Sequence, residues 1–119
     1  MALSRTDNAD ATAVAVRNGA TRVKRVTITQ RSNTAARLYL QIFNTNSPTV
    51  GTTAPDAVVP IPAGRAGMQI IQTAIFAGNL GGLLLPTGCA YAVTTTPTGA
   101  AGPSGSDRPR IDLHWTQAA

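Results

Sequence analysis

The sequence predicts an all-β fold, a single antiparallel β-sandwich of the jelly-roll or Greek-key kind. Threonine, a β-branched residue that favours strands, supplies seventeen of the 119 residues, whereas Glu, a strong helix former, is absent. Short segments of alternating apolar and polar residues recur at spacings of about 8 to 15 residues, with Gly, Pro and Asn between them. No segment has a persuasive helical pattern, so we expect less than about a tenth of the chain to be helical.

The chain is long enough for one domain with its own core, since 43% of its residues are hydrophobic. Residues 1–10 are polar or small, and such a segment has no burial to offset the entropy lost on ordering. We therefore expect an extended N-terminal arm over residues 1–10, held by a neighbouring chain that Arg5 and Asp7 reach. Residues 11–119 should form a single β-sandwich domain.

The first strands are predicted from alternation and turn signals. Residues 11–16 alternate weakly before a turn signal at 18–19, and a strand is favoured there over a short helix. Residues 37–44 carry apolar side chains on both faces, which predicts a central strand or one covered on both sides. A short turn at 32–35 should join this strand to the preceding one, so residues 22–44 are predicted to form a β-hairpin.

An irregularity is expected in the first strand of that hairpin. Val26 and Ile28 lie on one face of an alternating segment, but Val23 is out of phase with them. This change of phase predicts a β-bulge near residues 24–25.

The later strands follow in the same way. Residues 57–62 are extended, but their prolines cannot donate ladder hydrogen bonds, which predicts a sheet edge. Further strands are expected at 67–74, 89–96 and 110–116, the last with one apolar and one polar face, and residues 81–86 form another apolar run. The predicted core consists of Val26, Ile28, Leu38, Leu40, Ile42, Val93, Ile111, Leu113 and Trp115.

The chain has few groups that could do acid–base or metal chemistry. It has one His, one Cys and no Glu, and its best polar constellation is Arg110, Asp112 and His114 on the polar face of the last strand. A solvated sheet face explains these three residues better than a catalytic site does. Cys89 lies between apolar neighbours and should be a buried small hydrophobe. We predict no enzymatic activity, no cofactor and no metal site.

The charge distribution points to an anionic partner. Ten basic residues against five Asp give a net charge of +5, and six of the ten lie between residues 17 and 37 with no acid among them. Arg22, Lys24 and Arg25 are therefore candidates for partner contacts. Nucleic acid is a less favoured partner, which the sequence does not exclude, because few aromatic residues accompany the basic ones. The sequence offers no membrane span and no signal peptide.

Two segments and the closing strand carry a resemblance to a known group of proteins. "LYLQIFNTNSPTVGTTAPDAVVPIPAG" and "LLLPTGCAYAVTTTPTGA" resemble small β-sandwich virion proteins of tailed bacteriophages. The resemblance extends from Arg37 to Thr116 and leaves out the basic N-terminal third of the chain.

The resemblance implies a capsid decoration (cement) protein that binds the outer surface of a phage capsid and stabilises it. Its partner would be the major capsid protein, and it would be a homo-oligomer, either a trimer or a dimer. It would be made in the cytoplasm of the host bacterium and reside on the exterior of the virion. Two alternatives remain: a tail or fibre module that recognises a host receptor through loops 44–55 and 97–109, and a basic nucleic-acid-binding protein.

Overall fold

The structure, a computed structural model, describes residues 2–30, 37–63, 70–76, 82–103 and 107–118. These residues form nine β-strands and contain no α-helix, as the composition predicted. The strands are β1 (Ala2–Thr6), β2 (Val14–Asn18), β3 (Thr21–Gln30), β4 (Leu38–Phe43), β5 (Ala57–Ile61), β6 (Ile70–Ile75), β7 (Leu83–Leu85), β8 (Gly88–Thr94) and β9 (Arg110–Gln117).

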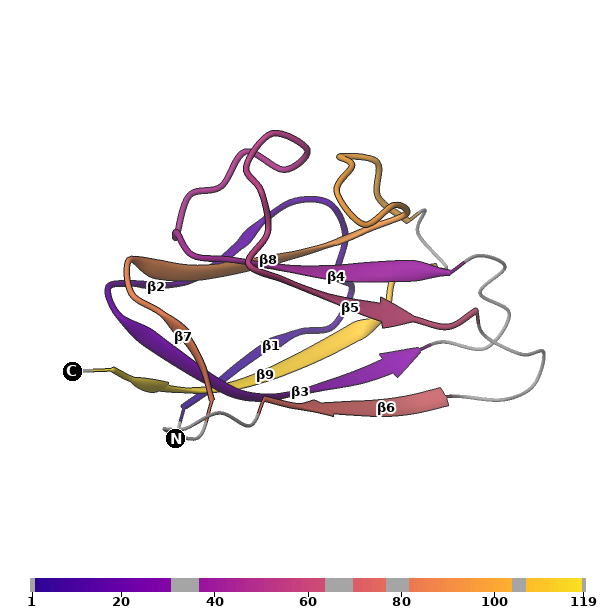
Figure 1. The fold of residues 1–119 in the computed structure, drawn as a ribbon. Coiled ribbons are helices and arrows are strands. Elements are labelled where there is room, and N and C mark those ends of the chain that lie inside the picture. The colour runs from indigo at the N-terminus through magenta and orange to yellow at the C-terminus, as the bar shows by residue number, and fades with distance from the viewer. Residues whose placement is uncertain (1, 31–36, 64–69, 77–81, 104–106, 119) are drawn as a thin grey trace.

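The strands form two antiparallel sheets that pack face to face (Figure 1). Sheet A has the order β1-β9-β3-β6, and β7 pairs with the remaining length of β3 beside β6. Sheet B has the order β2-β8-β4-β5. The predicted antiparallel β-sandwich is therefore confirmed.

Most connections carry the chain from one sheet to the other, and this corrects the predicted hairpin. Within residues 22–44, β3 pairs with β6, β7 and β9, whereas β4 pairs with β5 and β8. The two strands therefore lie in opposite sheets, and the turn expected at residues 32–35 lies outside the described residues. Alternation of apolar and polar residues shows which face is buried but not which strand is the neighbour, so the sequence pattern could not distinguish these arrangements.

The predicted bulge is present in β3. Val23 pairs with Trp115, and the next residue of β9, His114, pairs with Arg25. Lys24 is therefore the additional residue, and the extra position allows Val23 and Val26 both to be buried in the core.

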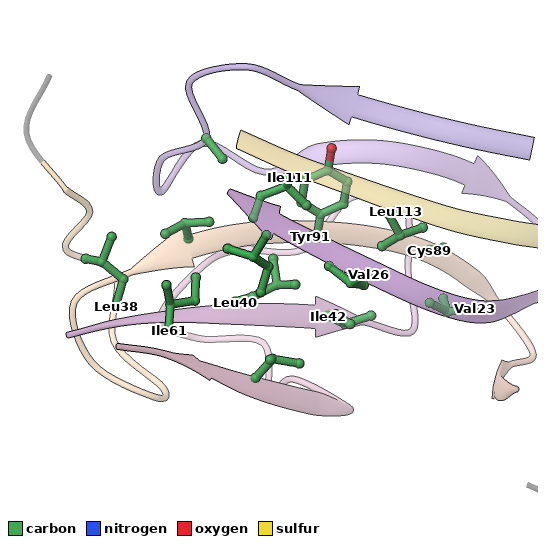
Figure 2. Packing of buried hydrophobic residues seen from close by; sticks show 14 of the residues in the cluster. Val23, Val26, Leu38, Leu40, Ile42, Ile61, Cys89, Tyr91, Ile111 and Leu113 are labelled. Atoms are coloured by element: carbon green, nitrogen blue, oxygen red, sulfur yellow. The ribbon is translucent and has the colours of Figure 1, made fainter. Parts of the chain in front are cut away.

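The core lies between the sheets and contains eight of the nine predicted residues, each at most 1% exposed. Trp115 is the exception, because it is only partly buried and packs against the side of this cluster. The guanidinium of Arg17 lies 5.9 Å from the Trp115 ring centroid. Figure 2 shows the ring of Tyr91 among the aliphatic side chains of both sheets, with its hydroxyl directed toward β1.

The edges of sheet B agree with the prediction, but the N-terminus does not. β5, which contains Pro60, is an edge strand, and β4 is buried on both faces. By contrast, Ala2–Thr6 does not extend away as an arm, because it pairs antiparallel with β9 of the same chain. Its side chains alternate between the core and solvent, so this short polar segment is ordered by pairing with a strand distant in sequence.

Candidate functional site

The two outer faces of the sandwich differ in how far the chain covers them. On sheet B the outward side chains of Gln41, Phe43 and Thr94 are fully buried. Residues 44–56 and 95–103 form two loops that lie over this sheet (Figure 1). No described loop crosses the outer face of sheet A. Sheet A is therefore the face that remains available to a partner.

Hydrogen bonds hold the second loop on sheet B. Gln41 Nε2 donates to Thr94 Oγ1 at 2.8 Å, to the carbonyl oxygen of Gly99 at 3.2 Å and to that of Thr96 at 3.3 Å. Thr95 N also donates to the carbonyl oxygen of Ala101 at 2.8 Å. The buried side-chain amide of Gln41 thus donates hydrogen bonds to carbonyl oxygens of the loop and holds the loop against the sheet.

The two loops also touch each other. Gly51 has a φ of 90°, a conformation that L side chains rarely adopt, and a Cβ at this position would lie 2.6 Å from the Cβ of Ala100. Any larger residue at position 51 would therefore push the loops apart.

The outer face of sheet A is defined by the outward side chains of its five strands. Strand register fixes this set, because residues that pair across antiparallel strands lie on the same side of a sheet. The set consists of Leu3, Arg5, Arg22, Arg25, Thr27, Thr29, Ile71, Thr73, Ile75, Leu84, Arg110, Asp112, His114 and Thr116.

All the large hydrophobic residues that the structure exposes lie on this face. They are Leu3, 49% exposed, Ile71, 67%, Ile75, 74%, and Leu84, 45%. Single exposed aliphatic residues are common on protein surfaces, but here all four lie on the one outer face that no described loop covers.

Arginines lie beside two of these four aliphatic residues. Arg22 pairs with Leu84 across the strands, and Arg25 pairs with Ile75, so each arginine stands beside an exposed aliphatic group. Lys24, the third basic residue that the sequence singled out, occupies the bulge between them. Arg22 and Arg25, predicted from the sequence as partner contacts, thus lie on this face, with Lys24 between them.

The apolar part of the face was not predicted from the sequence. The residues of β6 are Ile, Ile, Gln, Thr, Ala and Ile, and both its faces carry an isoleucine. Isoleucine on both faces would indicate an outward apolar surface only if one face of the strand were known to be uncovered, and the sequence does not show that.

An ionic row crosses the β1 end of the face. Arg5 Nε donates to Asp112 Oδ1 at 2.6 Å, and Arg110 Nε lies 3.6 Å from Asp112 Oδ2 and 3.8 Å from Asp7 Oδ1. The contact with Asp112 raises the pKa of Arg5 above its ordinary value. Arg5 and Asp7, expected to reach a neighbouring chain, thus contact β9 of their own.

The polar face of β9 also differs from the expectation. Asp112 is only 8% exposed, because the side chains of Arg5 and Arg110 contact it. In the described part of the chain no ion pair joins His114 to this row. The ion pair between Asp112 of β9 and Arg5 of β1 therefore links these two strands.

The remaining candidates offer no evident chemistry. A shallow hollow lies between residues 10–12, 102–103 and Arg108, where Asp10 accepts a hydrogen bond from Thr12 N at 2.9 Å and faces Arg108 at 3.5 Å. Cys89 is fully buried, and burial raises the pKa of its thiol to about 12. Within the described ranges, no group of three metal-ligating side chains occurs, and no helix could span a membrane.

Comparisons with protein-family models, with curated proteins and with solved structures gave no match.

Proposed function

We propose that this protein is a structural virion component, a capsid decoration (cement) protein that binds the outer surface of a phage capsid through the outer face of sheet A. The observation that carries the proposal is the difference between the two outer faces. The chain's own loops cover sheet B, whereas sheet A leaves four aliphatic side chains among arginines in contact with solvent. Such a face suits a binding role.

The mixture of groups on this face favours an acidic protein surface as partner. Burial of the aliphatic side chains would contribute the hydrophobic part of the binding energy, at roughly 25 cal/mol per Å² of apolar area removed from water. Arginines beside them favour carboxylates on the partner and speed association. The outward side chains named above include no Phe, Tyr or Trp, which makes the face a poor stacking platform for nucleic-acid bases.

The strand order also supports a role in a virus particle. We interpret the order β1-β9-β3-β6 facing β2-β8-β4-β5 as a jelly roll, an architecture common among viral capsid domains. Because jelly rolls also serve other functions, the face and the resemblance to phage virion proteins carry more weight than the architecture does.

A partner surface that recurs many times on the particle would allow stable attachment even if each single contact is weak. On a capsid lattice many copies of the major capsid protein present the same surface, and an oligomer that binds several sites at once gains affinity by multivalency. The same view assigns the protein no enzymatic activity, since its buried thiol and its engaged Asp112 carboxylate are structural groups.

A matched pair of charge reversals tests the docking face. Arg25 is exposed on sheet A, whereas Arg37 is exposed immediately before β4 in sheet B. We expect Arg25→Glu to weaken co-sedimentation with capsids of the encoding phage by about tenfold or more, since 1.4 kcal/mol corresponds to a factor of ten. Arg37→Glu, which changes the net charge equally, should bind like the wild type. Equal effects of the two reversals would contradict a specific docking face.

Copy number and salt dependence separate the alternatives. Quantitative mass spectrometry of purified particles should find hundreds of copies, whereas a handful would favour the tail or fibre module. Binding to capsids should persist as the salt concentration rises, because apolar contacts contribute part of the binding free energy. A steep log-linear loss of binding to nucleic acid, with no binding to empty capsids, would instead support the nucleic-acid alternative.

A further inference from the structure

Five of the described strands end a sheet, and four of them carry a feature that discourages pairing with another chain. β7 is only three residues long, β5 contains Pro60, β2 is bulged between Ala15 and Arg17, and the outward Arg5 of β1 is charged. Short length, proline, bulges and outward charge are the usual protections of edge strands.

β6 has none of these protections. It is six residues long, contains no charged residue and no proline, and its register with β3 is continuous. Among the described strands it pairs only with β3, so none of them pairs with its other edge (Figure 1). Two of its outward side chains, Ile71 and Ile75, are the most exposed large hydrophobic residues of the described chain. An edge of this kind is a template for strand addition.

We propose that β6 pairs antiparallel with the β6 strand of a second copy, about a two-fold axis through Thr73. The outward side chains of β6 are Ile71, Thr73 and Ile75, a pattern that reads the same in both directions. A reversed second copy therefore presents the same residues, so that Ile71 faces Ile75 and Thr73 faces Thr73. Aliphatic pairs and Thr–Thr pairs are favourable cross-strand contacts.

The pairing also keeps the outer faces continuous. Residues opposite one another in antiparallel strands share a face, and Thr73 points outward on both copies. A shift of one residue would place the inward Gln72 or Ala74 opposite an outward residue and turn the second sandwich over. The Thr73 register joins two copies of sheet A into one sheet with a single outer face.

Charge favours this edge-to-edge arrangement over stacking of two outer faces. Stacked faces would bring arginines of both copies together across a spacing of about 10 Å. In the edge pairing, the β3 strands that carry Arg22 and Arg25 are separated by three strand spacings, about 14 Å, which exceeds the screening length of about 8 Å at physiological salt. The uncharged β6 strand can therefore pair with β6 of a second copy without charge repulsion.

Cysteine cross-linking tests the register. Thr73→Cys would place two thiols directly opposite, within the Cα separation that a disulfide accepts. We expect the full-length variant to form a disulfide-linked dimer under mild oxidation. Wild type should not, because Cys89 is buried.

The neighbouring positions provide matched controls. Ile71→Cys alone should remain monomeric on denaturing gels, since its two copies would lie four residues apart along the strands, about 13 Å. A mixture of Ile71→Cys and Ile75→Cys should form the mixed dimer. Equal cross-linking of every single variant would overturn the register.

Charge substitution tests the same contact without covalent chemistry. Thr73→Lys would place two like charges opposite each other at the axis, whereas Thr27→Lys adds the same charge one strand inward on the same face. Light scattering should find Thr73→Lys monomeric and Thr27→Lys dimeric, and mixing Thr73→Lys with Thr73→Glu should restore a dimer.

A wild-type protein that is monomeric at every accessible concentration would overturn the proposal. So would β6 amides that become protected from exchange only on a capsid, which would assign the edge to a different partner. The cross-linking and light-scattering measurements use the purified protein without capsids, so their outcome is independent of the proposed capsid role.

Discussion

The hydroxyl of Tyr91 lies 2.5 Å from Thr6 Oγ1, so a side chain from the interior of sheet B hydrogen-bonds an edge strand of sheet A. Ser4 Oγ lies 3.4 Å from the same hydroxyl. Because Tyr91 is fully buried, these two side chains of β1 are the partners that satisfy its hydroxyl. The contact joins the N-terminal strand to the opposite layer of the sandwich.

We expect Tyr91→Phe to lower the free energy of unfolding by about 0.5 to 1.5 kcal/mol, the usual net value of a hydrogen bond. A double-mutant cycle with Thr6→Val should give a coupling energy of about 1 kcal/mol in denaturant titrations. Tyr39→Phe, at a partly exposed tyrosine of β4, serves as the control and should change stability little. Strictly additive effects of Tyr91→Phe and Thr6→Val would contradict the contact.

Deletion of residues 2–6 should destabilise the isolated subunit and lower its thermal midpoint. The deletion uncovers the edge of β9, removes the Arg5 contact of Asp112 and leaves the Tyr91 hydroxyl without its partners. This result is the opposite of what a free arm would give. Leu3→Ser changes only an exposed side chain and should stay within about 0.5 kcal/mol of wild type. An unchanged midpoint after the deletion would restore the arm interpretation.

Gln41→Leu should loosen the loop over residues 95–101. The substitution removes the donor that the carbonyls of Thr96 and Gly99 share, and should cost about 1 to 3 kcal/mol for buried groups left without partners. Hydrogen exchange at the Thr95 amide should accelerate, because that amide bonds the same loop. Gln72→Leu, which removes one exposed hydrogen bond to Pro60, is the matched control and should have a smaller effect.

The Cys89 thiol should make stability fall at alkaline pH. Burial raises its pKa from 9.0 to about 12, so the folded state retains a proton that the unfolded state releases. The stability this contributes is complete below pH 9 and is lost as pH rises from 9 to about 12. Relative to Cys89→Ala, wild type should lose at most about 1.4 kcal/mol per pH unit in that range. A constant difference between the two proteins would contradict this.

Local sequence patterns correctly predicted those structural features that depend on a single strand. The phase change between Val23 and Val26 located the bulge, the prolines of 57–62 located an edge, and two apolar faces marked β4 as covered on both sides. Each inference needed only the alternation of side chains and the donors that proline lacks.

Features that depend on strand partners could not be obtained in this way. Nothing in residues 2–6 shows that β9 will lie beside them, and nothing in β6 shows that loops will cover sheet B and leave sheet A bare. The basic part of the candidate site was therefore predicted from charge alone. Its apolar part became evident only when the register placed Ile71, Ile75, Leu3 and Leu84 on one face.

The position of β9 between β1 and β3 has a consequence for synthesis on the ribosome. A nascent chain that has not yet released residues 110–117 has no partner for β1 and one unpaired side of β3. Sheet A therefore closes only after translation has passed its last strand, and until then the unpaired edges of β1 and β3 remain open to chaperones or to misassembly. Because that final step joins segments from opposite ends of the chain, we expect refolding on a timescale of milliseconds to seconds, slower than for helical domains of similar size.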